Sequence, residues 1–281
     1  MVQKLNDIVI KGSSDKPILM DVALKINSKP KAVVVFCHGF KGFKDWGPFN
    51  QIANYFAEKD FVFLKFNFSY NGTTTKNPFN FDDLEAFGQN NFCKELDDLS
   101  LVLKWIKRCD VLKGEIDKSK ISLFGHSRGG GIAMLKSAED NSLAKIVSWA
   151  SPSDFLISLP SGEKLQKWKN NNIVYIYNGR TKQNMPLYFQ FYENCIANSK
   201  RLNIQNSVTR MRIPHLVVHG SDDPTVLVTE AENIKKWNSN TNLHVITGAN
   251  HVFGSFHPYN IDGFPKHLQQ AIDYTISFLK E

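Results

Sequence analysis

The sequence predicts an α/β fold, in which helices cover both faces of a mainly parallel central sheet. Two observations support this prediction. Short runs of β-branched and aromatic residues alternate with longer segments of helical period, as expected when parallel strands are joined by helices. The runs VVVFC and ISLF contain almost no polar residues, which is typical of strands buried on both faces. We therefore expect one main domain, with one segment inserted between two of its strands.

Eight candidate strands follow from these runs. They are Leu5 to Lys11, Ile18 to Ile26, Ala32 to Cys37, Phe61 to Phe66, Lys120 to Phe124, Ala144 to Trp149, His215 to His219 and Leu243 to Ile246. The first two are expected to pair as an antiparallel edge. The clearest helix candidate is Asn91 to Cys109. Its apolar residues recur at alternating steps of four and three, so they define one face that should cover the sheet.

Residues 151–207 interrupt the alternation with many aromatic residues and several Lys, Asn and Gly. We interpret them as an inserted cap subdomain on a core made of residues 1–150 and 208–281. Within the cap, Ile173 to Tyr177, followed by Asn178 and Gly179, is typical of a short strand entering a turn. A long surface loop is the alternative, although loops above about 15 residues with no structure of their own are uncommon.

The composition limits the class of protein. Of the 281 residues, 42% are hydrophobic and 22% are charged, which is ordinary for a soluble globular domain. The formal charge is +7, but Lys and Arg are scattered among Asp and Glu, so nucleic-acid binding is not indicated. The N-terminus lacks a basic start followed by a long apolar run, and no stretch approaches the roughly 20 apolar residues of a membrane helix. We therefore expect a cytoplasmic protein without a membrane partner.

Cofactor and metal chemistry find no support in the sequence. The four cysteines, Cys37, Cys93, Cys109 and Cys195, are widely spaced and form no CxxC pair. This spacing indicates neither a zinc site nor a disulfide framework. No nucleotide or flavin motif is present either, so no cofactor is expected.

The segment ISLFGHSRGG carries the strongest functional signal. Gly125, Ser127 and Gly129 form a GxSxG pattern directly after an apolar strand and before the helix-compatible run IAMLKSA. Glycines on either side relieve the clashes of a sharp strand-to-helix turn, which would expose Ser127 above the sheet. The N-terminus of the following helix favours negative charge at the reacting centre. A glycine-rich turn with an incidental serine is the alternative.

A serine hydroxyl needs a base within hydrogen-bond reach and a group that orients this base. The run HGSDDPTV follows a predicted strand and offers Asp222 and Asp223, of which Asp223 is the favoured acid. The loop TGANHVFG follows the last strand and offers His251 as the general base. Asp222 is also a candidate for a turn or capping residue. Asp154 is a second choice for the acid, and His257 for the base.

The negative oxygen of a tetrahedral intermediate requires two amide donors. The backbone N–H of Phe40, in the loop after AVVVFC, and that of Arg128, next to Ser127, are the candidates. A plain turn at the end of the strand is the alternative for His38 and Gly39.

The motifs CHGF, GHSRGG, HGSDDPTV and GANHVF together resemble the α/β-hydrolase superfamily from Lys31 onward. The cap and the segments RTKQNMPLYFQFY and GANHVFG are similar to bacterial carboxylesterases of the cinnamoyl and feruloyl esterase group, and more distantly to dienelactone hydrolases and acyl-peptidase domains. The resemblance implies an α/β-hydrolase fold and ester hydrolysis, with Ser127 as nucleophile, His251 as base, Asp223 as acid and Phe40 and Arg128 as amide donors. Many relatives have Pro where this chain has Leu227.

These features predict a serine hydrolase that cleaves small-molecule carboxylic esters through an acyl-enzyme. Aromatic residues in the cap suit an aromatic or short-to-medium acyl group, or they pack the core of the cap itself; they are Phe155, Trp168, Tyr175, Tyr177, Tyr188, Phe189, Phe191 and Tyr192. A peptidase or acyl-amide hydrolase would use the same groups. A catalytically silent binding protein of the same fold is the third interpretation.

Overall fold

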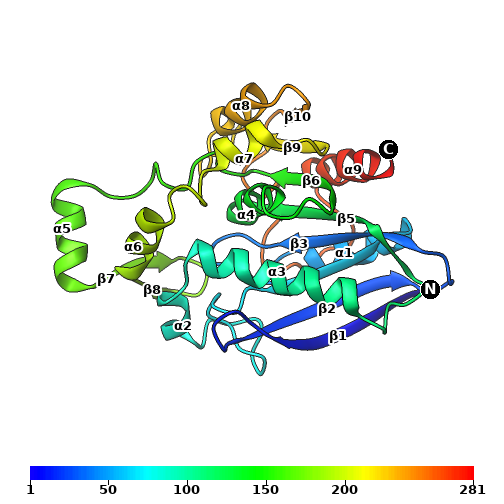
Figure 1. The fold of residues 1–281 in the computed structure, drawn as a ribbon, viewed down its shortest axis with the longest axis horizontal. Helices are drawn as coiled ribbons and strands as arrows, with labels where there is room; N and C mark the ends of the chain where they lie inside the picture. Colours follow the sequence, from blue (N-terminus) through cyan, green and yellow to red (C-terminus); the bar gives the residue numbers. More distant parts are fainter.

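The computed structural model describes residues 1–281, and eight of its strands form one sheet in the order β1-β2-β4-β3-β5-β6-β9-β10 (Figure 1). The strands of this sheet are β1 (Val2–Lys11), β2 (Pro17–Lys25), β3 (Lys31–Cys37), β4 (Val62–Asn67), β5 (Ile116–His126), β6 (Leu143–Trp149), β9 (His215–Gly220) and β10 (Thr241–Ile246). β2 pairs antiparallel with both β1 and β4, and the pairs from β4 to β10 are parallel. The carboxyl ends of these parallel strands therefore meet at one edge of the sheet.

Helices cover both faces of the sheet. They are α1 (Phe49–Glu58), α2 (Leu84–Gly88), α3 (Phe92–Arg108), α4 (Arg128–Ser137), α5 (Gly162–Asn171), α6 (Gln190–Ala197), α7 (Ile204–Arg210), α8 (Val228–Trp237) and α9 (Lys266–Lys280). One apolar layer joins the sheet to α3, α4, α7 and α8, and a second joins it to α1 and α9. The α/β fold with two helical layers is thus confirmed.

The structure contains all eight predicted strands, and β1 and β2 form the expected antiparallel edge. β5 begins at Ile116, earlier than the predicted Lys120. The prediction missed the first residues of the strand because most of them are polar. The predicted helix over residues 91–109 is α3. The side chain of Asn91 caps α3 by accepting a hydrogen bond from the Lys94 amide, and Cys109 follows its last turn in an extended conformation.

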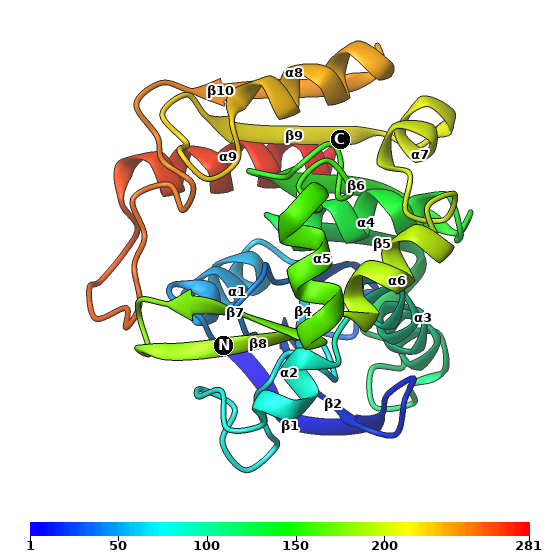
Figure 2. The ribbon, with the colours of Figure 1, turned by 90° about the vertical axis from the view of Figure 1, so that its left-hand side faces the viewer.

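The chain between β6 and β9 has secondary structure of its own and is not a long loop. It contains α5, the antiparallel hairpin of β7 (Ile173–Asn178) and β8 (Gln183–Tyr188), and α6. These elements project from the core at the left of Figure 1 and lie toward the viewer in Figure 2. The boundary at residue 207 falls inside α7, which packs on α4 and α8 of the core.

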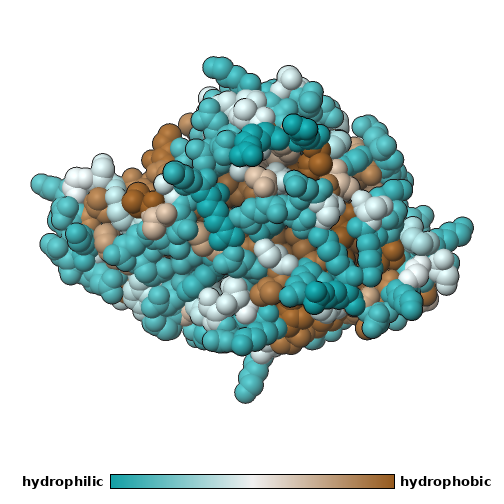
Figure 3. All heavy atoms as spheres, viewed as in Figure 1, coloured by the Kyte–Doolittle hydropathy of each residue, from teal (hydrophilic) through white to brown (hydrophobic).

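Hydrophilic residues dominate the face of the molecule shown in Figure 3, and its apolar residues form separate patches. None of the helices combines the length and the apolar character that crossing a bilayer requires.

Candidate active site

The turn between β5 and α4 holds Ser127 in a backbone conformation that side chains rarely adopt. Its φ is 55° and its ψ is −125°, and its amide donates a 2.8 Å hydrogen bond to the carbonyl of Trp149 at the end of β6. The close approach of chain segments requires the flanking glycines: a Cβ at Gly125 would lie 2.2 Å from the Gly129 carbonyl oxygen, and one at Gly129 would lie 2.1 Å from that of Cys37. Ser127 therefore stands at the edge of the sheet, directly before α4.

Three of the predicted side chains meet at this edge. The Nε2 atom of His251 lies 3.1 Å from the Oγ of Ser127, and its Nδ1 lies 2.7 Å from the Oδ2 of Asp223. This geometry suits the tautomer in which Nδ1–H donates to the carboxylate and Nε2 accepts the serine proton. The side chain of Asp223 is fully buried, whereas 17% of the His251 side chain is exposed.

The loop after β9 holds Asp223 as a carboxylate. Its Oδ1 accepts hydrogen bonds from the amides of Thr225 and Val226 at 2.8 and 2.9 Å. Burial alone would raise the pKa of Asp223, but hydrogen bonds from His219, His251 and the Val226 amide outweigh it and hold the pKa well below its usual range. The group thus stays negative and can stabilise a positive charge on His251.

The other candidates for acid and base lie elsewhere. Asp222 is exposed and accepts a hydrogen bond from the Ser221 hydroxyl. Asp154 is exposed as well and accepts from the Leu156 amide. His257 accepts a 2.9 Å hydrogen bond from the Gly47 amide through Nδ1. None of these three side chains contacts His251 or Ser127 by a hydrogen bond, so Asp223 is the carboxylate that the fold brings to the histidine.

The two amides expected to bind an oxyanion have no acceptor within the protein. Neither the N–H of Phe40 nor that of Arg128 donates a hydrogen bond to a backbone or side-chain group. The loop after β3 also passes close to the serine, because a Cβ at Gly39 would lie 3.1 Å from the Cβ of Ser127. Both amides are therefore free to donate, and both belong to chain segments next to Ser127.

Three buried histidines around this group were not predicted to support it. The Nε2 of His126 lies 2.9 Å from the carbonyl oxygen of His251. The Nε2 of His219 lies 2.8 Å from the carbonyl oxygen of Val226 and 3.4 Å from Oδ2 of Asp223. The ring of His38 bridges the Gly39 carbonyl and the Phe68 amide. The sequence offered one signal for these contacts: His126 lies within the motif GHSRGG, and His38 lies within CHGF.

The aromatic residues of the insertion divide into two groups. Trp168, Phe189 and Phe191 are buried and pack together, with the Trp168 and Phe189 rings 5.7 Å apart. In contrast, 62% of Tyr175 and 60% of Tyr177 is exposed. The buried rings belong to the same apolar layer as the sheet, α3 and α4, so they join the insertion to the main core and do not form a separate core of the insertion.

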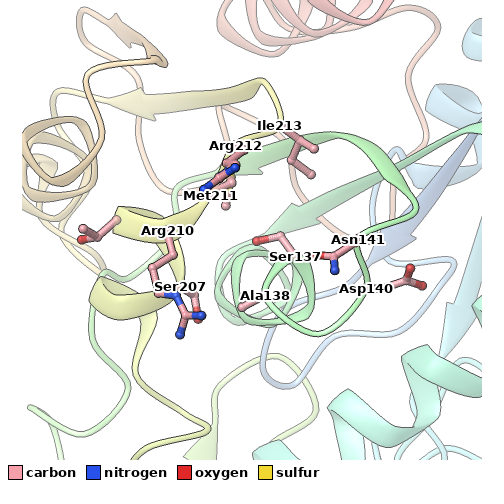
Figure 4. A pocket seen from close by; sticks show the side chains of 10 residues that line it. Ser137, Ala138, Asp140, Asn141, Ser207, Arg210, Met211, Arg212 and Ile213 are labelled. Atoms are coloured by element: carbon pink, nitrogen blue, oxygen red, sulfur yellow. The ribbon is translucent and has the colours of Figure 1, made fainter.

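A cavity of about 690 Å³ lies at the far end of α4 from Ser127 (Figure 4). Ser137 and Asp140 line it on one side, and Ser207, Arg210 and Arg212 line it on the other. Ser127, Asp223 and His251 do not line this cavity.

A mainly parallel sheet that presents a strained serine on the turn between a strand and a helix defines an α/β hydrolase. Residues 88–255 match the sequence model of a family described as alpha/beta hydrolase fold, and the chain belongs to this family. A search of curated protein sequences gave no significant match.

Solved structures with the same fold cover almost the whole chain. Est1E from Butyrivibrio proteoclasticus with bound ferulic acid superposes with a TM-score of 0.73 at 16% identity, over 98% of this chain and 100% of that one. A dienelactone hydrolase from Anabaena variabilis gives a TM-score of 0.64 at 13% identity, over 99% and 97%. A puromycin hydrolase gives 0.67 at 14% identity, over 99% of this chain and 39% of that one.

Proposed function

We propose that this protein is a serine hydrolase that cleaves carboxylic esters of small molecules carrying aromatic or short-to-medium acyl groups. The observation that carries the proposal is the hydrogen-bonded series from Ser127 through His251 to Asp223. Two unpartnered amides beside the serine complete the groups that acyl transfer needs. Est1E, with ferulic acid bound, and the dienelactone hydrolase favour esters as the substrate class.

In the proposed reaction, His251 takes the proton of Ser127 while the hydroxyl oxygen attacks the ester carbonyl. The amides of Phe40 and Arg128 hold the oxygen that becomes negative. The bond to the leaving oxygen then breaks, and His251 protonates the departing alcohol. A water molecule, activated by His251, cleaves the acyl-enzyme and restores Ser127. These steps use side chains, backbone amides and water alone.

We also propose that residues 151–207 act as a cap that forms part of the substrate site. Phe191 of α6 packs against Phe92 of α3 with ring centroids 5.0 Å apart. At the hairpin, the Tyr177 carbonyl accepts a 3.4 Å hydrogen bond from Lys41 of the loop after β3. These contacts support a position of the insertion beside the carboxyl edge of the sheet, where an acyl group would lie.

Replacing the nucleophile tests the proposal directly. Ser127→Ala is expected to lower kcat for a 4-nitrophenyl ester by a factor of about a thousand or more, because the attacking atom is lost. Ser119→Ala, at the opposite end of β5, is the matched control and should keep full activity. Labelling by a fluorophosphonate should occur in the wild type and be lost in Ser127→Ala. Undiminished turnover in Ser127→Ala would reject the proposal.

Amide hydrolysis is the second candidate, favoured by the structural similarity to a puromycin hydrolase. A panel of aryl esters, short alkyl esters and aminoacyl anilides separates the two. Faster cleavage of the anilides would assign the site to amide hydrolysis, while Ser127 would keep the same role.

A further inference from the structure

Arg128 follows the nucleophile, and its side chain extends between three aromatic rings from three different elements. Its guanidinium carbon lies 4.1 Å from the ring centroid of Phe40 in the loop after β3. The corresponding distances are 4.9 Å to Phe92 of α3 and 5.8 Å to Phe191 of α6. The guanidinium therefore lies at the junction of the core and the insertion, one residue from the reacting hydroxyl.

Most of the hydrogen-bonding capacity of this guanidinium is unused. Its one protein partner is Oε1 of Glu95, at 3.3 Å from Nη1. The Nε and Nη2 atoms donate to no protein acceptor and are not completely buried, and 15% of the Arg128 side chain is exposed. These two atoms form one edge of the guanidinium, and their parallel N–H bonds match the spacing of the two oxygens of a carboxylate.

The charge of Arg128 is only weakly compensated. Glu95 is buried, accepts a 2.7 Å hydrogen bond from Asn90 through the same Oε1, and leaves its Oε2 without a partner. Burial raises the pKa of Glu95, against the opposing effect of Arg128, so this carboxyl holds its negative charge weakly. A cation held against apolar rings with a weak counter-charge attracts a second anion.

The order of the sheet indicates which part of an ester would reach Arg128. β3 and β10 lie on opposite sides of β5, so Phe40 and His251 approach Ser127 from opposite sides. The leaving oxygen must lie next to His251 to receive its proton. The acyl group therefore extends away from His251, toward the Phe40 ring and the guanidinium stacked on it.

We propose that the Nε–Nη2 edge of Arg128 binds a carboxylate carried by the acyl group, so that the preferred substrates are monoesters of dicarboxylic acids. The inference rests on the proposed ester hydrolysis and narrows its substrate class. Arg128 thereby has two separate roles: its backbone amide faces the oxyanion, and its side chain selects the acyl group.

Two esters with acyl chains of equal carbon number test the proposal, namely mono-4-nitrophenyl glutarate and 4-nitrophenyl valerate. The wild type is expected to show a kcat/KM at least about tenfold higher for the glutarate ester at low ionic strength, as charge-assisted bidentate pairs are strong. Arg128→Gln should lower this ratio by about tenfold or more. Arg128→Lys should give an intermediate ratio, because it keeps the charge and loses the paired donors.

The matched control is Lys94→Gln, which removes a neighbouring positive charge on α3 whose ammonium lies 3.9 Å from the Tyr70 ring. This variant should keep the wild-type ratio. Equal ratios in the wild type and Arg128→Gln would overturn the inference while leaving ester hydrolysis in place. If the wild type cleaved neither ester, the proposed function would fail. In that case, binding of free glutarate to Ser127→Ala protein would test the inference independently of hydrolysis. The added Arg128→Gln change should weaken this binding about tenfold, and unchanged binding would overturn the inference.

Discussion

His126, the residue before the proposed nucleophile Ser127, links the serine turn to the loop that carries His251, the proposed base. Its Nε2 donates to the carbonyl oxygen of His251, and the two imidazole rings lie 5.0 Å apart. Burial lowers the pKa of His126 to about 3, so the ring is neutral in the pH range of ordinary assays. A neutral imidazole has one N–H, and this contact places it on Nε2. We infer that His126 is a positioning residue for His251.

Loss of this hydrogen bond is expected to affect turnover more than folding. His126→Phe should lower kcat for a 4-nitrophenyl ester by about tenfold or more, because small misplacements of a catalytic group are costly. His126→Gln, which can place an amide donor near the former Nε2, should recover part of the loss. Steady-state kinetics on both variants measure the effect, with urea denaturation as the control for stability. Wild-type kcat in His126→Phe would contradict the positioning role.

The role of an individual residue could be predicted from the sequence where the residue belongs to a motif. Ser127 and His251 could be placed because each lies in a loop after a predicted strand, and parallel strands end at one edge. The choice between Asp222 and Asp223 required side-chain directions, since both belong to the same loop. Glu95 was missed because its partner, Arg128, is 33 residues away. No local pattern records such a contact.

Among the elements, a buried ion network fixes the loop after β3, which carries Phe40. Lys44 and Asp45 of this loop meet Asp21 of β2 and Lys65 of β4, and all four side chains are buried. Lys44 lies 2.5 Å from Asp21 and 2.6 Å from Asp45, and Lys65 contacts both carboxylates. Two cations and two anions balance, so every charge in the network has partners of opposite sign.

Breaking this balance should destabilise the protein strongly. Lys65→Met leaves the two carboxylates with Lys44 alone and is expected to lower the free energy of unfolding by about 3–5 kcal/mol, because a buried charge loses its partner. Urea denaturation monitored by tryptophan fluorescence measures the change. Lys11→Met removes the exposed pair with Asp15, with side chains 78% and 86% accessible, and should leave the unfolding midpoint unchanged. Equal midpoints for both variants would refute the importance of the network.

Helices and strands could be predicted where their sequences have a clear hydrophobic pattern. Strands with continuous apolar runs and the amphipathic α3 were found, since burial imposes the period on the sequence. β8 was not, because it contains Pro186 and has an exposed residue, Asn184, near its start. Its partner β7 is recognisable from Ile173 to Tyr177. The predicted cap boundary at residue 207 lies inside α7. The sequence did not indicate this helix because it is short and because its packing on α4 depends on the tertiary structure.

For the whole molecule, the packing that forms the two core layers also encloses several histidines in uncharged form. Burial lowers the pKa of His38 to about 4 and that of His126 and His215 to about 3. His215 lies in β9, away from Ser127, and its ring contacts the hydroxyls of Ser148 and Thr241 at 2.9 and 3.3 Å. A substitution at His215 therefore tests the stability of the core without altering the proposed chemistry.

These depressed values predict that acid destabilises the fold. The unfolded chain, with histidine pKa values near 6.5, binds protons between about pH 6.5 and pH 3, where the folded chain does not. The stability due to the neutral rings is therefore complete above about pH 6.5 and falls as the pH drops toward 3. Each ring contributes a slope of up to about 1.4 kcal/mol per pH unit. Glu95 and Asp98, whose pKa values burial raises, act in the opposite sense.

The contribution of one ring can be isolated in the core. His215→Gln removes a titrating group but keeps polar atoms near Ser148, so its free energy of unfolding should depend less steeply on pH between 6 and 4 than that of the wild type. The expected difference in slope is up to about 1.4 kcal/mol per pH unit, measured by urea denaturation at several pH values. Identical slopes would mean that His215 already binds a proton in the folded state, against the low pKa that its enclosure between β6 and β10 produces.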